Sequence, residues 1–397
     1  MNQLTKTLRS VTTGLVAAAL LAGGLGATVF ASVQAAGCTV VEGGSTTVYP
    51  ALQNAQPSFQ SANPGCSLTL GQQGSSAGIA GLIGGSTGGV TYTAGTFDVA
   101  ASSRAGKTSG GVNGGNEKSA AYFWKIGGDA MTFAVASSSN MSFLTNITAV
   151  QVQGIWNNTC QFWDDCGLGG PHVGIIARSR DLSSGTYSDM LSFFAITAAQ
   201  EANVVARVGL PRLLTSADDA AAATQDYAIV YTSLSNLGFT GTKDLPLSGG
   251  APLSIGNAST FVTPSALHVQ NGTYPAPRVL YMALQKFSNA GVDGVNATNI
   301  VKAEALVNYM ASSAGQSSVA NVGFVQVAPF VPIPNYDVNL DGAVSLGDLG
   351  AITSKWGTSN AVPGWVRADA NNDGAIALGD IGVVISHWGG TGFVAPN

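Results

Sequence analysis

The chain has 397 residues, of which 9% are charged and 52 are glycine, and its formal net charge is −5. This length is sufficient for two or three domains. The chain lacks a basic stripe that could neutralise nucleic-acid phosphates, which argues against nucleic acid as a partner. A hydrophobic content of 45% indicates a packed globular chain, and low charge with abundant small and hydroxyl residues is typical of a secreted protein.

Residues 1–36 have the pattern of a signal peptide. Lys6 and Arg9 precede an apolar run over 11–30, and residues 33–35 form an A-x-A-like cleavage site. Glycines interrupt the run, which favours cleavage over a retained membrane anchor. We therefore expect a secreted or cell-surface protein, periplasmic if the cell has an outer membrane. The segment ending at Cys38 also resembles a weak lipoprotein box, so lipidation of this cysteine stays open.

Four cysteines remain after the signal peptide, an even number that suits an oxidising compartment. Cys160 and Cys166 bracket five residues and are expected to close a short disulfide loop. Cys38 and Cys66 lie at or near the starts of two expected strands and are candidates for a second disulfide. A zinc site is not expected, because none of the three histidines lies at ligand spacing from a cysteine.

In chain order, an expected strand is followed by a turn rich in Gly, Ser and Thr four times. The strands are expected at 39–41, 67–70 and 173–177 and within a third unit at 96–104, and helices follow the first, second and fourth turns. This alternation predicts an α/β fold with mostly parallel sheets. Ligands of such folds bind beyond the carboxyl ends of the strands, where all four turns would lie.

The fourth turn has the composition of an oxyanion socket. Arg180 precedes Ser184, Gly185 and Thr186, and Tyr187 opens the apolar periodicity of a helix. The first N–H groups of a helix lack internal partners and carry the positive end of its dipole. Together with hydroxyls and an arginine, they can bind a tetrahedral anion. The alternative is a hydroxyl-capped helix with a surface arginine.

The four turns and two later segments carry a family resemblance. Residues 44–50 (GSTTVYP), 74–78 (GSSAG), 97–104 (FDVAASSR) and 180–186 (RDLSSGT) resemble the anion loops of the phosphate-binding component of the bacterial and archaeal ABC phosphate transporter. Residues 269–281 and 315–325 resemble later segments of the same family. The resemblance covers the mature chain to about residue 328.

This resemblance implies a two-lobed type II periplasmic-binding-protein fold over 37–328, with the second lobe at about 140–250 and a hinge between the lobes. It implies capture of inorganic phosphate for import by an ABC permease, without catalysis. It also implies a set of phosphate-binding residues, with Asp181 orienting the arginine of the fourth turn. These residues are Thr46, Thr47, Val48, Ser75, Ser103, Arg104, Arg180, Ser184, Gly185 and Thr186.

The chain departs from the best-known family pattern at one position. There, a carboxylate accepts the proton of phosphate, whereas this chain has Ser103 followed by Arg104. A serine can still accept a hydrogen bond, so phosphate remains the expected ligand. Discrimination against sulfate is left open, and Arg104 could also be a solvated residue of the turn.

A serine hydrolase is a less favoured alternative. Residues 74–78 match G-x-S-x-G, which would make Ser76 a nucleophile. The pattern arises easily in a chain rich in Gly and Ser. The candidate bases, His172, His268 and His387, lie in poor contexts for a catalytic triad.

A second module follows a Pro-rich linker at 329–336. The segment 337–348 (DVNLDGAVSLGD) recurs at 369–380 (DANNDGAIALGD), each copy being an EF-hand-like calcium loop that leads into one helix. Trp356 and Trp388 are expected on the apolar faces of these helices. The expected ligands are Asp337, Asn339, Asp341, Ala343, Ser345 and Asp348 in the first loop, and Asp369, Asn371, Asp373, Ala375 and Asp380 in the second.

The repeat resembles a dockerin, a small all-α calcium-binding module, over 337–390, with a tail at 391–397. The resemblance implies two calcium ions, needed for folding, and docking onto a cohesin-bearing surface protein. The recognition positions hold Leu346-Gly347 and Leu378-Gly379, whereas the family's usual pair is polar. A purely structural or intramolecular role is the alternative for this module. For the whole chain, the alternative is a surface-assembly or adhesion protein with a relaxed oxyanion-binding lobe pair.

Overall fold

The computed structural model describes residues 38–286, 297–358, 367–371 and 373–396. The expected signal peptide at 1–36 lies outside these residues. In the part of the chain that is described, no helix has both the length and the apolar character needed to cross a membrane.

The first sheet has the strand order β2-β1-β5-β14-β6. Its strands are β1 (Cys38–Gly44), β2 (Cys66–Leu70), β5 (Val99–Ser102), β6 (Ala121–Ala130) and β14 (Pro277–Gln285). β1 pairs in parallel with β2 and β5, whereas β14 pairs antiparallel with β5 and β6. The expectation of mostly parallel sheets is therefore wrong. The chain leaves this sheet along β6 and returns along β14, so these neighbours run in opposite directions.

The second sheet has the order β11-β7-β10-β9 and is also mixed. β10 (Ala228–Thr232) pairs in parallel with β9 (Ile176–Arg178) but antiparallel with β7 (Thr132–Ala136), and β11 (Thr242–Asp244) pairs antiparallel with β7. The remaining strands form two small sheets. They are β8 (Ile147–Thr148), β12 (Leu247–Ser248) and β13 (Phe261–Val262) in one, and β3 (Gly85–Thr87) and β4 (Val90–Tyr92) in the other.

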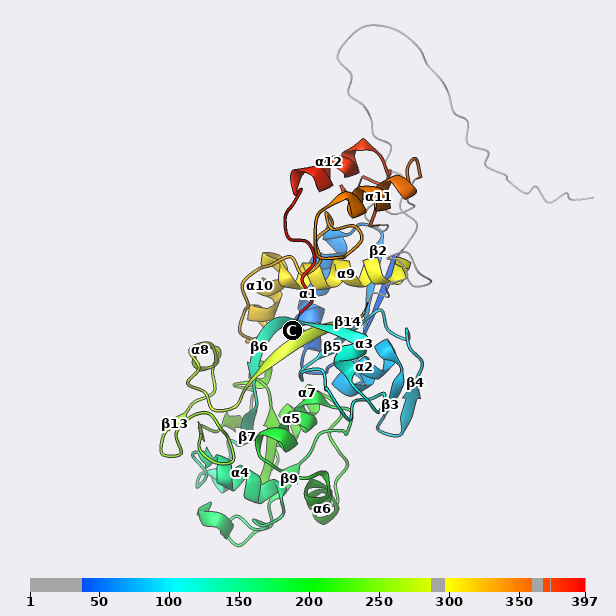
Figure 1. Ribbon diagram of the computed structural model, residues 1–397. Coiled ribbons are helices and arrows are strands. Elements are labelled where there is room, and N and C mark those ends of the chain that lie inside the picture. Colours follow the sequence, from blue (N-terminus) through cyan, green and yellow to red (C-terminus); the bar gives the residue numbers. More distant parts are fainter. Residues whose placement is uncertain (1–37, 287–296, 359–366, 372, 397) are drawn as a thin grey trace, which may run out of the picture. The chain divides into compact units, whose positions relative to one another are not determined.

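Helices follow the first, second and fourth turns, as the sequence predicts. α1 (Tyr49–Ala62) buries Leu52, Ala55 and Phe59 completely, because residues three and four apart share one helix face. The other helices before the C-terminal module are α2 (Ser75–Ile83), α3 (Glu117–Ala120), α4 (Ala149–Trp156), α5 (Gly185–Phe193), α6 (Ala198–Val208), α7 (Ser216–Ala223), α8 (Ala266–Gln270), α9 (Ala297–Ala311) and α10 (Ser313–Asn321). These helices flank the two sheets (Figure 1).

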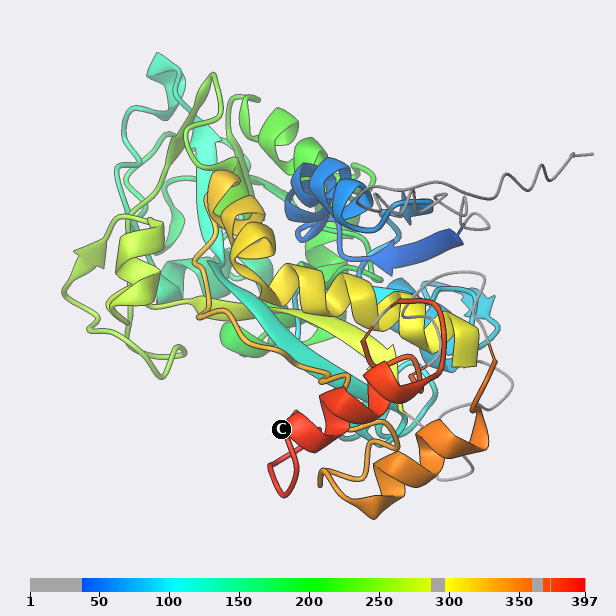
Figure 2. The same ribbon diagram turned by 90° about the horizontal axis from the view of Figure 1, so that it is seen from above.

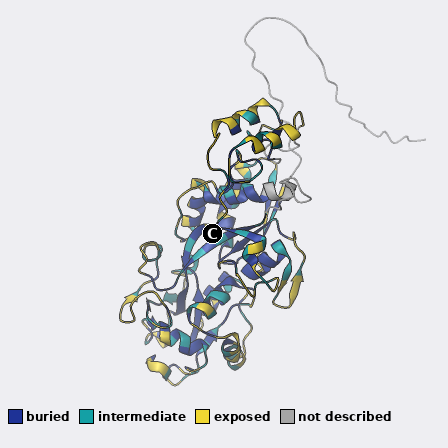
Figure 3. Ribbon diagram, viewed as in Figure 1, coloured by how far each residue is buried: buried dark blue, intermediate teal, exposed yellow. Residues whose placement is uncertain are grey.

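Two adjacent segments connect the lobes built on the two larger sheets. Met131 links β6 to β7, and its N–H donates to the carbonyl oxygen of Ala276, just before β14, at 2.9 Å. The Tyr274 hydroxyl donates to the carbonyl oxygen of Met131 at 3.1 Å. β6 and β14 consequently lie side by side along the connection (Figure 2). Buried residues fill both lobes and this junction (Figure 3).

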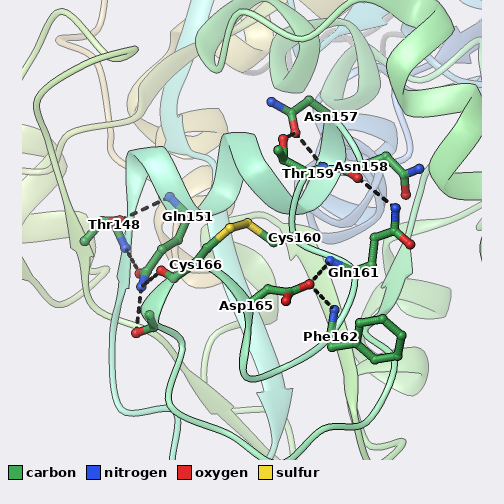
Figure 4. The surroundings of a disulfide bond; sticks show 11 residues. Thr148, Gln151, Asn157, Asn158, Thr159, Cys160, Gln161, Phe162, Asp165 and Cys166 are labelled. Atoms are coloured by element: carbon green, nitrogen blue, oxygen red, sulfur yellow. Dashed lines mark hydrogen bonds between the residues drawn. A yellow bond between two sulfur atoms is a disulfide. The ribbon is translucent and has the colours of Figure 1, made fainter.

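The predicted disulfide between Cys160 and Cys166 is confirmed (Figure 4). It closes a tight loop in which Asp165 Oδ2 accepts hydrogen bonds from the N–H groups of Gln161 and Phe162 at 2.7 and 2.8 Å. In the first sheet, the backbone of Cys38 lies opposite Cys66 in the β1–β2 register. The side chain of Cys38 is outside the described part.

The C-terminal module contains α11 (Leu346–Ser354) and α12 (Leu378–Ser386) and has a small core of its own. Ile352 and Val384 are fully buried in this core, one from each helix. The expectation that the two tryptophans complete the apolar faces is wrong, because Trp356 and Trp388 are 47% and 49% exposed. Each lies two residues beyond the end of its helix.

Candidate oxyanion-binding site

The ten predicted anion-site residues are all buried and lie at four chain turns. Thr46 and Thr47 precede α1, Ser75 begins α2, and Ser103 follows β5. Thr186 lies in the first turn of α5, which follows β9. All four turns therefore follow strands, and three of them lead directly into helices, which is the arrangement expected from the sequence.

Hydrogen bonds join these turns in pairs. The hydroxyls of Thr47 and Thr186, 139 residues apart, lie 3.1 Å from each other. The hydroxyls of Ser75 and Ser103 are 3.3 Å apart, and the Ser103 N–H donates to Ser75 Oγ at 3.0 Å. The N–H of Val48, predicted as a ligand donor, instead donates to Ser45 Oγ at 3.3 Å.

Gly185 is required by the close approach of the two lobes. A Cβ atom at this position would lie 2.4 Å from Ser75 Oγ and 2.5 Å from Ser103 Oγ. Gly185 is also the first residue of α5, whose N-cap Ser184 accepts a hydrogen bond from the Tyr187 N–H. The first N–H groups of a helix have no helical acceptor, and this end of α5 lies at the junction.

The second and fourth turns are held together by hydrogen bonds between lobes. The Ser76 N–H donates to the carbonyl oxygen of Ser183 at 2.9 Å. The Ser183 hydroxyl donates to the carbonyl oxygen of Gln73 at 2.6 Å. The structure is thus a closed form, in which the anion-site hydroxyls are shielded from solvent.

Arg180 is 1% exposed, and a buried carboxylate orients it. Its Nη1 lies 2.5 Å from Asp219 Oδ2, and its Nη2 donates to Thr46 Oγ1 in the other lobe. Burial raises the pKa of Asp219 to about 7, and the Arg180 guanidinium opposes this shift. The expectation that Asp181 orients Arg180 is wrong. Asp181 Oδ1 accepts from the N–H and hydroxyl of Ser183 instead, at 2.8 and 2.6 Å.

Arg104 is also buried, so the alternative of a solvated turn residue is excluded. Its Nη1 and Nη2 donate to the two carboxylate oxygens of Glu117 at 2.7 and 2.9 Å. Burial alone would raise the pKa of Glu117. The hydrogen bonds and positive charge of Arg104 outweigh this effect, so the pKa lies below its usual range. Arg104 therefore carries a fixed charge beside the second and third turns.

The side chain of Ser76 is bound to this arginine. Its Oγ accepts from Arg104 Nη2 at 3.1 Å. The three histidines contact other groups, with Nδ1 of His172 bonded to Asp164, that of His268 to Thr263 and that of His387 to Ser386. The described residues therefore offer no Ser–His pair at Ser76, and the hydrolase pattern lacks its base.

A third buried arginine, Arg278, completes the cluster and was not predicted. Its Nη1 donates to Thr186 Oγ1 at 2.9 Å, and its Nε donates to Asp129 Oδ2 at 2.8 Å. Its Nη1 also lies 3.5 Å from Asp189 Oδ2. The signal was present in the sequence, because Arg278 is the only charged residue of the segment 269–281, which resembles the family.

The cluster is chemically suited to an oxyanion. Buried carboxylates position the three guanidinium groups. These ion pairs keep the arginines in place in a site from which solvent is excluded. Hydroxyl groups and the N-terminus of α5 add neutral donors. Such preorganised donors bind an anion without a metal.

The two C-terminal loops repeat one hydrogen-bond network. In the first, Asp337 accepts from the N–H groups of Asp341 and Gly342 at 3.2 and 3.0 Å. In the second, Asp369 accepts from Asp373 and Gly374 at 3.1 and 3.0 Å. The last loop positions are equally matched, because Asp348 and Asp380 both accept from two backbone N–H groups of their own loops.

The glycine after each exposed leucine has a local structural reason. A Cβ at Gly347 would lie 2.5 Å from the Asn339 Nδ2 atom, and one at Gly379 would lie 2.3 Å from that of Asn371. The third loop residue therefore folds over the eleventh. Among the described residues, no group of three or more His, Cys, Asp or Glu side chains is arranged to hold a metal ion. The donors expected here include amide and main-chain oxygens as well.

The two-lobed part of the chain is similar to known proteins. A protein of Clostridium perfringens, assigned as a phosphate ABC transporter substrate-binding protein and solved with bound phosphate, is 21% identical with a TM-score of 0.56, covering 73% of this chain and 99% of its own. An ABC-type phosphate transport receptor from Vibrio cholerae is 16% identical with a TM-score of 0.50, covering 72% and 100%. No curated protein matches. Residues 31–314 match the family model described as the PBP superfamily domain. The chain therefore belongs to the PBP superfamily and has its two-lobed α/β fold.

Proposed function

We propose that this protein binds inorganic phosphate between its two lobes and releases it unchanged. The observation that carries the proposal is the contact of Arg180 with Thr46 and of Thr186 with Thr47, which joins both lobes around buried anion donors. Charge-assisted hydrogen bonds contribute about 1.5–3 kcal/mol each, so a few of them support tight binding. The phosphate-binding proteins of similar fold support this choice of ligand.

The test is calorimetric titration of the full chain with phosphate, compared with Arg180→Ala. We expect one phosphate per chain in the intact protein and at least a hundredfold weaker binding in the variant. The substitution would leave Asp219 without its ion-pair partner and the bound anion without a positively charged donor. Arg178→Ala is the matched control. Arg178 is the last residue of β9, two residues before Arg180, and its Nη2 donates to the carbonyl oxygen of Pro211. Equal binding by Arg180→Ala and the intact protein would refute the proposal.

We further propose that the protein is secreted or held at the cell surface and delivers phosphate to an ABC permease. The signal-peptide pattern and the similarity to transport receptors support this role. Deletion of the gene should lower phosphate uptake at limiting phosphate. Unchanged uptake, with phosphate binding intact, would favour the alternative of a surface-assembly or adhesion protein.

For the C-terminal module we propose a dockerin-like role that requires two calcium ions. Aspartate, asparagine and backbone carbonyl oxygens are donors that calcium prefers, and both loops have the same turn geometry. The exposed Leu346 and Leu378, each 74% exposed, give a partner such as a cohesin an apolar contact surface. Calorimetric titration with calcium should give two sites, and Asp369→Ala should leave one.

A further inference from the structure

The anion site contains one carboxyl group more than its arginines require. Arg104 pairs with Glu117, Arg180 with Asp219 and Arg278 with Asp129. Asp189 is the additional acid. It lies 3.5 Å from Arg278 Nη1, its side chain is 15% exposed, and its Oδ2 has no hydrogen-bond partner among the described residues.

The position of Asp189 on α5 directs it toward the anion site. Asp189 follows Gly185 by four residues, and residues i and i+4 lie on the same face of a helix. At Gly185, this face lies so close to the hydroxyls of Ser75 and Ser103 that a side chain on residue 185 would clash with them. Asp189 is also three residues after Thr186, whose hydroxyl binds the same Arg278 nitrogen.

We propose that Asp189 shares a single proton with the bound oxyanion and thereby selects phosphate over sulfate. This inference rests on the proposed function of the site. Hydrogen phosphate carries a proton that an ionised carboxylate can accept. Sulfate is fully ionised at neutral pH, so it can share a proton only if the carboxyl group of Asp189 supplies it. If Asp189 is ionised, its carboxylate and the sulfate repel each other.

The surroundings of the carboxyl group place this proton in the physiological range. Burial raises the pKa of Asp189 to about 7, whereas the positive charges of Arg278 and Arg104 lower it. The negative charge of Asp129 on β6 adds to the increase in the pKa of Asp189. Tyr281 on β14 is also close enough to interact with the Asp189 carboxyl group. Below pH 7 the carboxyl group carries its own proton and can donate to sulfate. Above pH 7 only a ligand with its own proton avoids the repulsion.

Asp189 would therefore take the role that the family resemblance assigns to a carboxylate at the position of Ser103. Ser103 is buried against Ser75, and both hydroxyls face Gly185. The acceptor is then supplied by the opposite lobe, from the helix that also supplies the N-terminal donors. A change at the third turn is in this way balanced by a residue of the fourth.

The test is the dissociation constant of phosphate and of sulfate from pH 6 to pH 9, measured for the full chain and for Asp189→Asn. In the intact protein, sulfate binding should weaken about tenfold per pH unit above pH 7, because one proton is taken up with each anion. Phosphate binding should change far less. In Asp189→Asn, the amide N–H can donate to sulfate at any pH. We therefore expect sulfate binding without pH dependence, and phosphate binding within about tenfold of the intact protein.

Asp244→Asn is the matched control, since burial also raises the pKa of Asp244, but this residue lies on β11 and accepts from the Gly238 N–H. It should retain the selectivity of the intact protein. Phosphate binding by Asp189→Asn shows that this variant is folded. Phosphate binding with the same sulfate discrimination in Asp189→Asn would overturn the inference and leave the proposed function standing. Binding of neither anion by the intact protein would refute both.

Discussion

Arg278 Nη1 donates a hydrogen bond to the Oγ1 of Thr186, with 2.9 Å between the two atoms. Arg278 lies on β14, which carries the chain back into the first sheet, and it pairs there with Asp129 on β6. Thr186 belongs to the first turn of α5. One arginine thus links both strands of the lobe connection to the anion site.

This link makes Arg278 a determinant of affinity. We expect Arg278→Lys to weaken phosphate binding by about a hundredfold, because an ammonium group cannot reach Asp129 and Thr186 together. Calorimetric titration measures the loss, and Arg207→Lys is the control, since Arg207 Nε bonds Asn158 elsewhere. An unchanged dissociation constant for Arg278→Lys would mean that the contact with Thr186 is structural only.

Titration of the buried Glu42 carboxyl group should make the folding stability depend on pH. This residue is 1% exposed, its Oε1 accepts from the Ala101 N–H at 3.2 Å, and burial raises the pKa of its carboxyl group to about 8. The folded state therefore binds the proton more tightly than the unfolded state. Its stabilising contribution is complete below pH 4.5, the unfolded-state value, and is lost as the pH rises through 8.

Glu42→Gln keeps this position neutral at every pH. Its free energy of unfolding should match that of the intact protein near pH 5 and exceed it at pH 9, by up to several kcal/mol since one pKa unit is about 1.4 kcal/mol. Denaturant unfolding at both pH values measures the difference. Parallel stability curves for the two proteins would show that Glu42 does not titrate in this range.

Calcium should stabilise the C-terminal module of the full chain. Asp337 and Asp369 are the first residues of the two loops and are almost fully buried. A ligand that binds only the folded state at a hundred times its dissociation constant contributes about 2.7 kcal/mol. Scanning calorimetry should therefore show a calcium-dependent transition that a chelator shifts down and that the double variant Asp337→Ala, Asp369→Ala lacks. Magnesium is the control ion. A transition insensitive to calcium would contradict the proposal.

The pair Arg367–Glu304 should contribute strongly to holding the module against the first lobe. Arg367 Nη1 lies 2.7 Å from Glu304 Oε2 on α9, and Nη2 donates to the carbonyl oxygens of Pro334 and Asp337 at 2.6 Å. Removing one partner of a buried pair costs about 3–5 kcal/mol.

Arg367→Ala should therefore lower the midpoint of thermal unfolding, whereas phosphate binding should change little. The aromatic contact between Phe393 and Tyr122, 5.2 Å between ring centroids, would remain. An unchanged unfolding midpoint in Arg367→Ala would show that the module is not held by this pair.

The sequence predicts the local features of the site well. The turns before α1, α2 and α5 have the Gly, Ser and Thr composition that a helix start requires, and their residues all became buried neighbours. These features are local, because capping and apolar spacing act within a few residues.

The partners of the arginines could not be predicted in the same way. Asp219 lies 39 residues from Arg180, and Asp129 lies 149 residues from Arg278. Proximity in sequence favours Asp181 as the partner of Arg180, but the Asp181 carboxylate accepts from the Ser183 N–H within its own turn. The mixed sheets have a similar origin, since strand direction depends on how the chain crosses between lobes and not on the composition of one strand.

The most direct test of the account is a crystal structure of the full chain grown with phosphate. We expect one phosphate ion enclosed by residues of both lobes, in contact with Arg180, Ser75 and the N-terminus of α5. A closed structure without phosphate at this place, or phosphate bound only at the surface, would contradict the assignment of these buried groups as an oxyanion site.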